Sequence, residues 1–281
     1  MKKKSGKIIW VILLIISILV CILCSTFLIR YFFFDDSSYI ERPTTISQAP
    51  TDASETKEIE ETKKESENEI PAKKYAEDTT KLKEGEAVSF EEMMEVNEDI
   101  YAWIYIPGTS VDYPVAQSAK GVDDSFYLTH NIYKNYQFSG TIYTEKANSR
   151  DFSDPVTVLY GHNMLNGSMF ATLHNFNNVD FFSENNTIFV FTKDKTLTYL
   201  VYAAYQYDDR HILNSFDMSE PVNLRQYQES TLMKRPYYCN IRDGVELSTD
   251  DKIITLSTCM GGGGNTRYLV QGVLVNEEPT K

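Results

Sequence analysis

The sequence predicts a mainly β fold: a closed antiparallel β-barrel of seven to eight strands, with an N-terminal helix and a helix inserted between late strands. Three observations support this fold class. From residue 87 onward the chain is rich in Tyr and Phe, and the segment is long enough for one well-buried domain. It contains short strand-like runs separated by turn residues, with few helical segments. Its last two runs flank a glycine-rich connection typical of a hairpin.

The first elements follow from local signals. Ser89-Phe90-Glu91-Glu92 is a capping box and predicts a short helix to about Glu98. The first strand, Tyr101–Ile106, ends at Pro107-Gly108. The strand-like runs that follow are Val111–Ala116, Gly140–Thr144, Val156–Tyr160, Thr187–Thr192 and Leu197–Tyr207. In the last of them, every second residue from Tyr199 to Tyr207 is expected on one face.

The last third of the chain adds a helix and a hairpin. Ser219-Glu220-Pro221 supplies a cap and an early proline, which predict a helix to about Lys234. Two β-branched-rich runs follow, Lys252–Thr258 and Arg267–Val275. The glycines Gly261–Gly264 lie between them and permit the turn of a hairpin.

The N-terminal segment has the pattern of a membrane anchor. Residues 1–7 carry four lysines, and we expect them to form a cytoplasmic basic tail. The uncharged stretch Ile8–Ile29, closed by Arg30, is long enough as a helix to span the roughly 30 Å hydrocarbon core. A cleaved signal peptide would be shorter and end in small residues. We therefore expect a single-pass transmembrane anchor over residues 8–30, with the rest of the chain outside the cell.

The segment that follows differs sharply in composition. Residues 31–86 are dominated by Glu, Lys, Thr, Ser and Asp from Asp35 onward, so they cannot bury enough surface to order themselves. We expect an extracellular flexible linker there and one folded domain over residues 87–281. The net charge of −13 and the lack of a basic stripe in the folded part argue against nucleic-acid binding.

Cys259 is the strongest candidate for chemistry. The predicted hairpin puts its thiol at the end of one strand and Arg267 at the start of the next. A thiol beside a fixed positive charge is typical of a nucleophile. The guanidinium can also stabilise negative charge on a tetrahedral carbonyl oxygen. The alternatives are a half-buried structural cysteine and an ordinary surface arginine.

A thiol with an ordinary pKa near 8.5 is only about 3% ionised at pH 7, so a partner base is expected. His162 follows the strand Val156–Tyr160 and sits beside a glycine, as Cys259 does. From these residues alone, a functional and a structural role for His162 are equally open. We expect the other three histidines, His130, His174 and His211, to be solvated or capping residues.

The cysteines and histidines argue against other kinds of site. Only Cys239 and Cys259 lie outside the membrane run, and the histidines show no metal-ligand spacing, so zinc is not expected. An exported protein permits a disulfide between these two cysteines. Because that bond would cap the best nucleophile candidate, we expect both thiols to be free.

Together these residues resemble the class B sortases, over about Val88 to Val275. The motifs that carry the resemblance are Trp103–Thr109, Asp112–Val115, Tyr160–Met164, Asn166–Phe170, Thr255–Cys259 and the strand that begins with Arg267. The helix predicted from Ser219 resembles an insertion that distinguishes class B from class A, and the basic anchor agrees. The glycine run after Met260 departs from the family pattern and puts the resting distance between Cys259 and Arg267 in doubt.

The resemblance implies a sortase-like barrel and a cysteine transpeptidase of a Gram-positive-type cell surface. Cys259 would attack a sorting motif near the C-terminus of a secreted protein and form a thioacyl-enzyme. An amine of a peptidoglycan precursor or cross-bridge would then resolve it. His162 would move the protons and Arg267 would stabilise the oxyanion. This chemistry requires no metal or organic cofactor.

Some assignments stay open at this level. Ser257 and Thr258 flank the nucleophile and are candidates to contact the bound peptide, or are ordinary strand residues. Asp112, Asp208 and Asp209 are candidates to orient His162, and the spacing selects none of them. The rival functions are another wall-directed thiol peptidase and a non-catalytic tethered surface module.

Overall fold

The computed structural model describes residues 17, 18, 20–22, 24, 90–261 and 265–279. The chain divides into two units, Met1–Glu41 and Arg42–Lys281. In the first unit the described residues are helical. The predicted tail, most of the predicted anchor and the predicted linker lie outside the described residues. Within the described part of the chain, no helix is long and apolar enough to cross a membrane.

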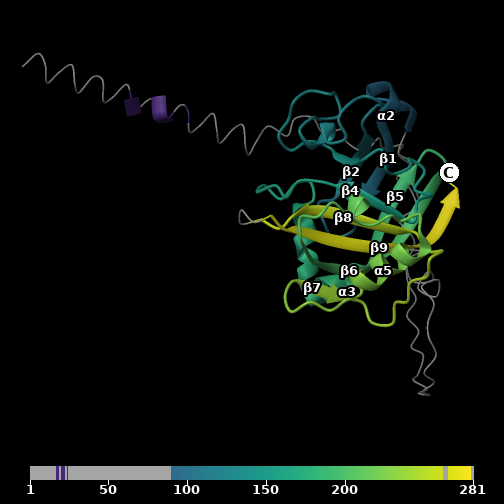
Figure 1. Cartoon of the computed structure of the whole chain (residues 1–281). Coiled ribbons are helices and arrows are strands. Elements are labelled where there is room, and N and C mark those ends of the chain that lie inside the picture. The colour runs from purple at the N-terminus through teal and green to yellow at the C-terminus, as the bar shows by residue number, and fades with distance from the viewer. Residues whose placement is uncertain (1–16, 19, 23, 25–89, 262–264, 280–281) are drawn as a thin grey trace, which may run out of the picture. The chain divides into compact units, whose positions relative to one another are not determined.

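The described strands of the second unit form one nine-stranded sheet (Figure 1), ordered β5-β1-β2-β3-β4-β8-β9-β6-β7. They are β1 (Ile100–Tyr105), β2 (Asp112–Gln117), β3 (Ile142–Thr144), β4 (Val156–Tyr160), β5 (Thr187–Thr192), β6 (Lys195–Tyr207), β7 (Cys239–Ile241), β8 (Ile253–Cys259) and β9 (Arg267–Pro279). β5 pairs with β6 as well as with β1, so eight strands close into a ring. β7 pairs with β6 outside that ring. The predicted closed barrel is confirmed.

Two neighbouring pairs in the ring are parallel, β2 with β3 and β4 with β8. The other described pairs are antiparallel, as the sequence predicts. Parallel neighbours need a long connection that returns the chain to the starting end. Residues 118–141 make that return between β2 and β3, and residues 161–252 lie between β4 and β8. The strand pattern predicts the eight strands of the ring but not the direction of each partner, and it misses the short β7.

Short helices flank the barrel. They are α2 (Phe90–Val96), η2 (Phe126–Leu128), η3 (Ala171–Asn177), α3 (Val179–Glu184), α4 (Ile212–Ser215) and α5 (Pro221–Thr231). α2 is the predicted N-terminal helix; Ser89 of its predicted capping box lies outside the described residues. α5 is the predicted late helix, and it ends three residues before Lys234. Its N-cap is Glu220, with Pro221 in the first turn, because Ser219 turns its hydroxyl to Asp217 instead.

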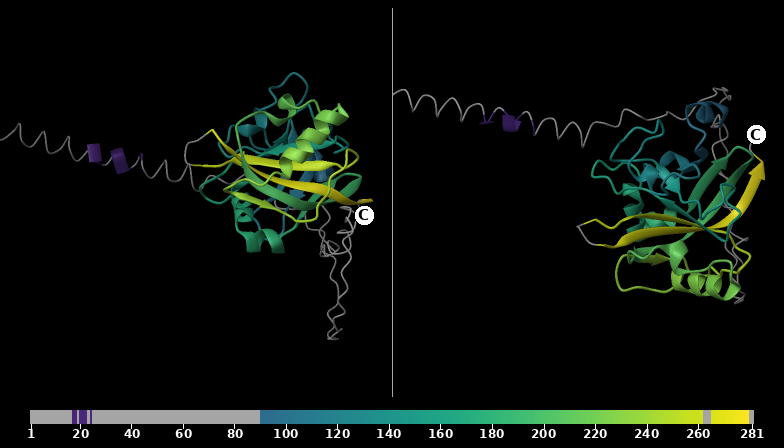
Figure 2. Two further views of the ribbon diagram at one scale, coloured as in Figure 1. Left: turned by 60° about the horizontal axis from the view of Figure 1, so that its bottom comes forward. Right: turned by 45° about the horizontal axis from the view of Figure 1, so that its top comes forward.

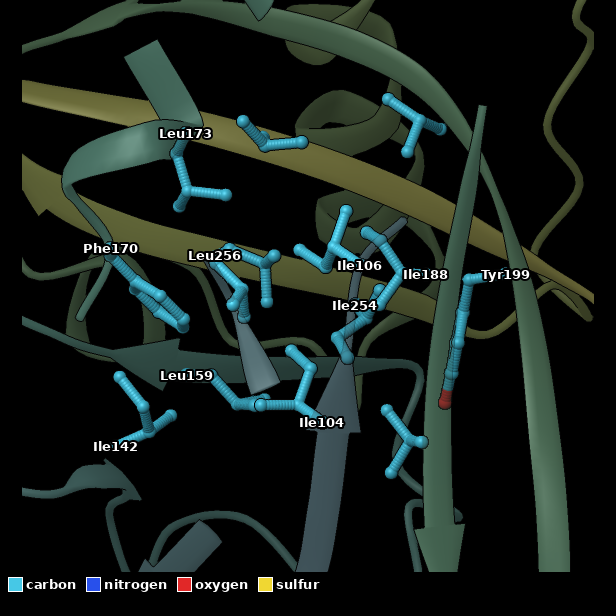
Figure 3. Packing of buried hydrophobic residues seen from close by; sticks show 14 of the residues in the cluster. Ile104, Ile106, Ile142, Leu159, Phe170, Leu173, Ile188, Tyr199, Ile254 and Leu256 are labelled. Atoms are coloured by element: carbon cyan, nitrogen blue, oxygen red, sulfur yellow. The ribbon is translucent and has the colours of Figure 1, made fainter. Parts of the chain in front are cut away.

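The barrel wall separates two hydrophobic cores. The interior core collects side chains from most strands and from η3, and Figure 3 shows Ile104, Leu159 and Ile254 of β1, β4 and β8 within it. The second core lies between the outer face of the wall and α5, which contributes Leu224 and Tyr227 (Figure 2). Burial on both faces explains why β4 and β8 of this wall contain no charged residues.

A β-bulge in β6 changes which face its side chains meet. The register with β9 shifts between Val201 and Ala203, which leaves Tyr202 as the extra residue. Before the bulge, Tyr199 and Val201 point into the interior core, whereas Ala203 points to the outer core. The prediction that every second residue from Tyr199 to Tyr207 shares one face is therefore wrong beyond Val201.

A buried polar network joins α5 to the barrel wall. Gln271 of β9 accepts a hydrogen bond from the Tyr202 hydroxyl at 2.6 Å and donates to the Tyr227 hydroxyl of α5 at 2.7 Å. It also donates to Thr255 of β8 at 3.2 Å, and the Tyr202 hydroxyl lies 3.0 Å from Thr231 Oγ1 at the end of α5. The network pairs polar groups that would otherwise be costly to bury between two apolar layers.

Candidate active site

Strand register brings Cys259, His162 and Arg267 to one end of the barrel. In the parallel pair of β4 and β8, Tyr160 lies opposite Ser257. His162 and Cys259 each follow that pair by two residues. In the antiparallel pair of β8 and β9, Cys259 lies directly opposite Arg267. Three residues far apart in the sequence thus meet at adjacent strand ends.

The thiol of Cys259 and the guanidinium of Arg267 are in direct contact. Arg267 Nη1 donates to Cys259 Sγ at 2.9 Å. Cys259 is half-buried, while Arg267 is exposed. The arginine therefore combines a fixed positive charge beside the sulfur with access from solvent. A reactive cysteine is typically found in such a partly exposed, positively charged environment.

A backbone carbonyl orients His162. Its Nε2 donates to the Leu128 carbonyl at 2.9 Å, and Phe138 stacks on the ring with centroids 5.3 Å apart. Because a carbonyl only accepts, the proton of the neutral ring lies on Nε2 and Nδ1 is left as the acceptor. Burial, with a smaller contribution from the Arg267 charge, lowers the pKa of His162 below its ordinary value, while the bond to Leu128 acts in the opposite sense. The imidazole is accordingly neutral at neutral pH.

The segment that supplies the Leu128 carbonyl is itself fixed. The Tyr127 hydroxyl donates to the buried carboxylate of Asp99 at 2.7 Å, and the Tyr127 carbonyl accepts from Thr141 N–H. Gly140 has φ +62°, and a Cβ there would clash with the Leu128 carbonyl. The position of this carbonyl therefore depends on contacts with Asp99, just before β1, and with the chain before β3.

Gly161 is required by close packing behind His162. A Cβ at this position would lie 2.5 Å from Ile142 Cδ1 and 2.7 Å from Phe170 Cδ2. Its N–H donates to the Ser257 carbonyl at 3.2 Å, which continues the contact between β4 and β8 by one residue. The absent side chain lets the chain turn into His162 while it stays against the barrel interior.

Two of the three candidate orienting carboxylates, Asp112 and Asp208, are engaged elsewhere. Asp112 accepts from Trp103 Nε1 at 2.6 Å, and Asp208 pairs with Arg210. Sequence reasoning missed Leu128, because a backbone carbonyl leaves no mark on residue type.

The other histidines divide between expected and unexpected roles. His211 caps α4, as predicted, by accepting from Asn214 N–H, and its Nε2 contacts Glu145 at 2.6 Å. His130 bonds the Phe126 carbonyl. His174 differs from the prediction, because its Nε2 donates to the backbone carbonyl of Cys259 at 3.1 Å. Its asparagine-rich surroundings in the sequence gave no signal of this contact.

Ser257 and Thr258 are strand residues with buried side chains. They are 6% and 1% exposed, and Thr258 Oγ1 has no hydrogen-bond partner. Contact between these two residues and a bound peptide stays a prediction.

Cys239 and Cys259 are both free, as expected. Three strand-to-strand steps, from β8 through β9 and β6 to β7, separate them. At about 4.8 Å a step this is roughly 14 Å, far beyond the reach of a disulfide. Among the residues that the structure describes, no group of three or more His, Cys, Asp or Glu side chains is arranged to hold a metal ion.

The chain is similar in sequence and in fold to known proteins. Residues 104–275 match the family model of the sortase domain. Sortase B of Listeria monocytogenes serovar 1/2a is 31% identical over 191 residues, which cover 66% of this chain and 74% of that protein. The crystal structure of Clostridium perfringens sortase B is 31% identical, with a TM-score of 0.56, over 67% of this chain and all of that one. Staphylococcus aureus sortase B has a TM-score of 0.58 at 26% identity, over 66% of this chain and 86% of that one.

Proposed function

The chain belongs to the sortase family and is a class B member of these cysteine transpeptidases of cell-wall sorting. We propose that Cys259 is its nucleophile and that it cleaves a C-terminal sorting motif of secreted proteins. The sulfur attacks the scissile carbonyl carbon, and a C–S bond forms. The C–N bond then breaks, the amine fragment leaves, and the N-terminal part of the substrate stays as a thioester on Cys259.

The observation that carries this proposal is the 2.9 Å contact between Arg267 Nη1 and Cys259 Sγ. A guanidinium this close places a permanent positive charge beside the attacking sulfur. Its remaining N–H donors are available for the oxyanion that develops next to the sulfur. Removal of one oxyanion donor typically lowers a rate by about 10²–10³, so we expect Arg267→Ala to slow acylation by that factor.

His162 moves the protons in both half-reactions. In the first, Nδ1 of the neutral imidazole takes the proton that the Cys259 thiol loses as the sulfur attacks, and gives it to the leaving amine; in the second, Nδ1 takes a proton from the incoming amine and returns it to the sulfur. The bond from Nε2 to the Leu128 carbonyl supports this assignment, because it leaves Nδ1 as the exchanging atom. Attack of the second amine on the thioester then breaks the C–S bond and restores the thiol.

The partners follow from this chemistry and from the N-terminal sequence. The donors are secreted proteins with a C-terminal sorting signal, and the acceptor is an amine of a peptidoglycan precursor or cross-bridge. Residues 8–30 anchor the chain in the cell membrane with residues 1–7 in the cytoplasm. Residues 31–86 tether the catalytic domain, 87–281, on the outer face. The length and apolar composition of Ile8–Ile29 support the anchor.

The experiment that tests this function is amine-dependent transfer. The full-length protein in detergent is incubated with a library of sorting-motif peptides and an acceptor amine, and products are identified by mass spectrometry. The expected product joins the N-terminal part of a peptide to the amine, and Cys259→Ala forms none of it. Cleavage that persists in Cys259→Ala would overturn the assignment of the nucleophile.

A further inference from the structure

The backbone carbonyl of Cys259 accepts two side-chain hydrogen bonds. Asn163 Nδ2 donates at 3.1 Å and His174 Nε2 also donates at 3.1 Å. The carbonyl of Ser257, two residues earlier and on the same edge of β8, accepts from the Gly161 backbone instead. Beyond Gly161 the chain turns away from β8, so no backbone donor continues the ladder. Two side chains take its place at the residue that carries the thiol.

We propose that His174 and Asn163 are positioning residues that hold the thiol of Cys259 against Arg267. This inference rests on the proposed function, in which Cys259 is the nucleophile. Neither residue touches the sulfur in the described contacts, and both act through the peptide unit that follows it.

That peptide unit is held from both sides. Its carbonyl meets Asn163 and His174, while its N–H, from Met260, donates to the Thr266 carbonyl at 3.0 Å. The next residue, Gly261, has φ +90°, a conformation that glycine adopts readily, so the chain turns directly after Met260, one residue beyond β8. Without the two side-chain donors, rotation at the end of β8 would move Cys259 relative to Arg267. The two side-chain donors therefore hold the end of β8 at Cys259.

Both donors are fixed by their own contacts. The His174 ring, in η3, stacks on Tyr268 of β9 with centroids 4.8 Å apart. Burial lowers the pKa of His174 below its ordinary value, so the ring is neutral at neutral pH and donates its Nε2 proton. Asn163 forms an isolated β-bridge with Met169, which ties it to the turn that leads into η3. The turn before η3 therefore links Asn163 to the helix that carries His174.

A donor swap separates this role from simple packing. His174→Phe keeps an aromatic ring to stack on Tyr268 and removes the donor, whereas His174→Gln removes the ring and restores an N–H donor. We expect His174→Phe to lower the maximal acylation rate about tenfold, with the half-saturating peptide concentration within twofold of wild type. His174→Gln should recover most of the rate.

The second donor is tested by Asn163→Leu, which is similar in size and has no donor. It should behave like His174→Phe, and thermal unfolding monitors the fold of all three variants.

Alkylation of Cys259 by iodoacetamide gives a readout that needs no substrate. The full-length protein and its variants are alkylated at pH 7, and peptide mapping follows Cys259 separately from Cys239. We expect slower alkylation in His174→Phe and Asn163→Leu, because the sulfur loses its fixed place beside Arg267, and recovery in His174→Gln. Wild-type rates in His174→Phe, or equally slow His174→Phe and His174→Gln, would overturn the proposal. If wild type alkylates but never acylates, the proposed function fails and the alkylation series still decides this inference.

Discussion

The ring of His162 is fixed by the Leu128 carbonyl at one nitrogen and by Phe138 on its face. No carboxylate among the described residues contacts it, so a fixed carbonyl sets its tautomer without adding negative charge. Burial and the Arg267 charge then keep the imidazole neutral. At this scale the site combines one permanent positive charge with one neutral base.

These lowered pKa values predict how stability depends on pH. Burial lowers the pKa of His162 and of His174 below the ordinary 6.5. Between the lowered folded values and 6.5 the unfolded chain therefore binds more protons, and the free energy of unfolding falls as pH drops through that window. Above pH 6.5 the two histidines are neutral in both the folded and the unfolded chain, so they do not make the free energy of unfolding depend on pH. Urea unfolding of wild type and of His162→Gln/His174→Gln, at several pH values from 7.5 down to 4.5, should give a shallower acid slope in the variant. If the free energy of unfolding falls equally with pH in wild type and in the variant, the lowered pKa values of His162 and His174 are contradicted.

At the scale of elements, the turn after β4 places His162 because Gly161 has no side chain. We expect Gly161→Ala to destabilise the protein by about 1–3 kcal/mol through overpacking, and to slow acylation by displacing His162. Gly272→Ala is the matched control, since a Cβ there would lie 2.9 Å from Tyr199 Cβ, on a strand position away from the site. Chemical denaturation and single-turnover acylation are measured for both. Equal slowing by both variants would show that lost stability, not the position of His162, causes the effect.

The junction between α5 and the barrel offers a second test at this scale. Gln271 is fully buried and joins Tyr202, Tyr227 and Thr255. Replacement of Gln271 by Leu leaves buried hydroxyls with fewer partners, which we expect to cost about 1–3 kcal/mol. The urea unfolding midpoint measures this loss. A midpoint equal to or above that of wild type would show that the network adds nothing to the attachment of α5.

For the whole molecule, what could be predicted depended on whether a feature is local in sequence. The hairpin of β8 and β9 was predictable, because two strand-like runs and a glycine turn lie within about thirty residues. The predicted hairpin placed Cys259 and Arg267 at adjacent strand ends, and the structure has them directly opposite each other. Most strands were predicted within a few residues for the same reason.

Other features depend on contacts between distant segments. The parallel pairing of β4 and β8, which aligns His162 with Cys259, joins segments about ninety residues apart. The bulge at Tyr202 and the role of the Leu128 carbonyl are backbone properties with no mark in residue type. His174 reaches Cys259 only because η3 packs over the barrel end. Residue types therefore indicated the chemistry, whereas the parts that position it required the fold.

The most direct test of the central claim is the covalent intermediate on Cys259. Intact mass spectrometry of the full-length protein, mixed with sorting-motif peptides, should show a mass gain equal to the N-terminal fragment of a peptide. The gain should be absent in Cys259→Ala and should disappear when an amine is added. If no peptide adds mass while iodoacetamide also leaves Cys259 unmodified, the residue is structural and the account of this site is contradicted.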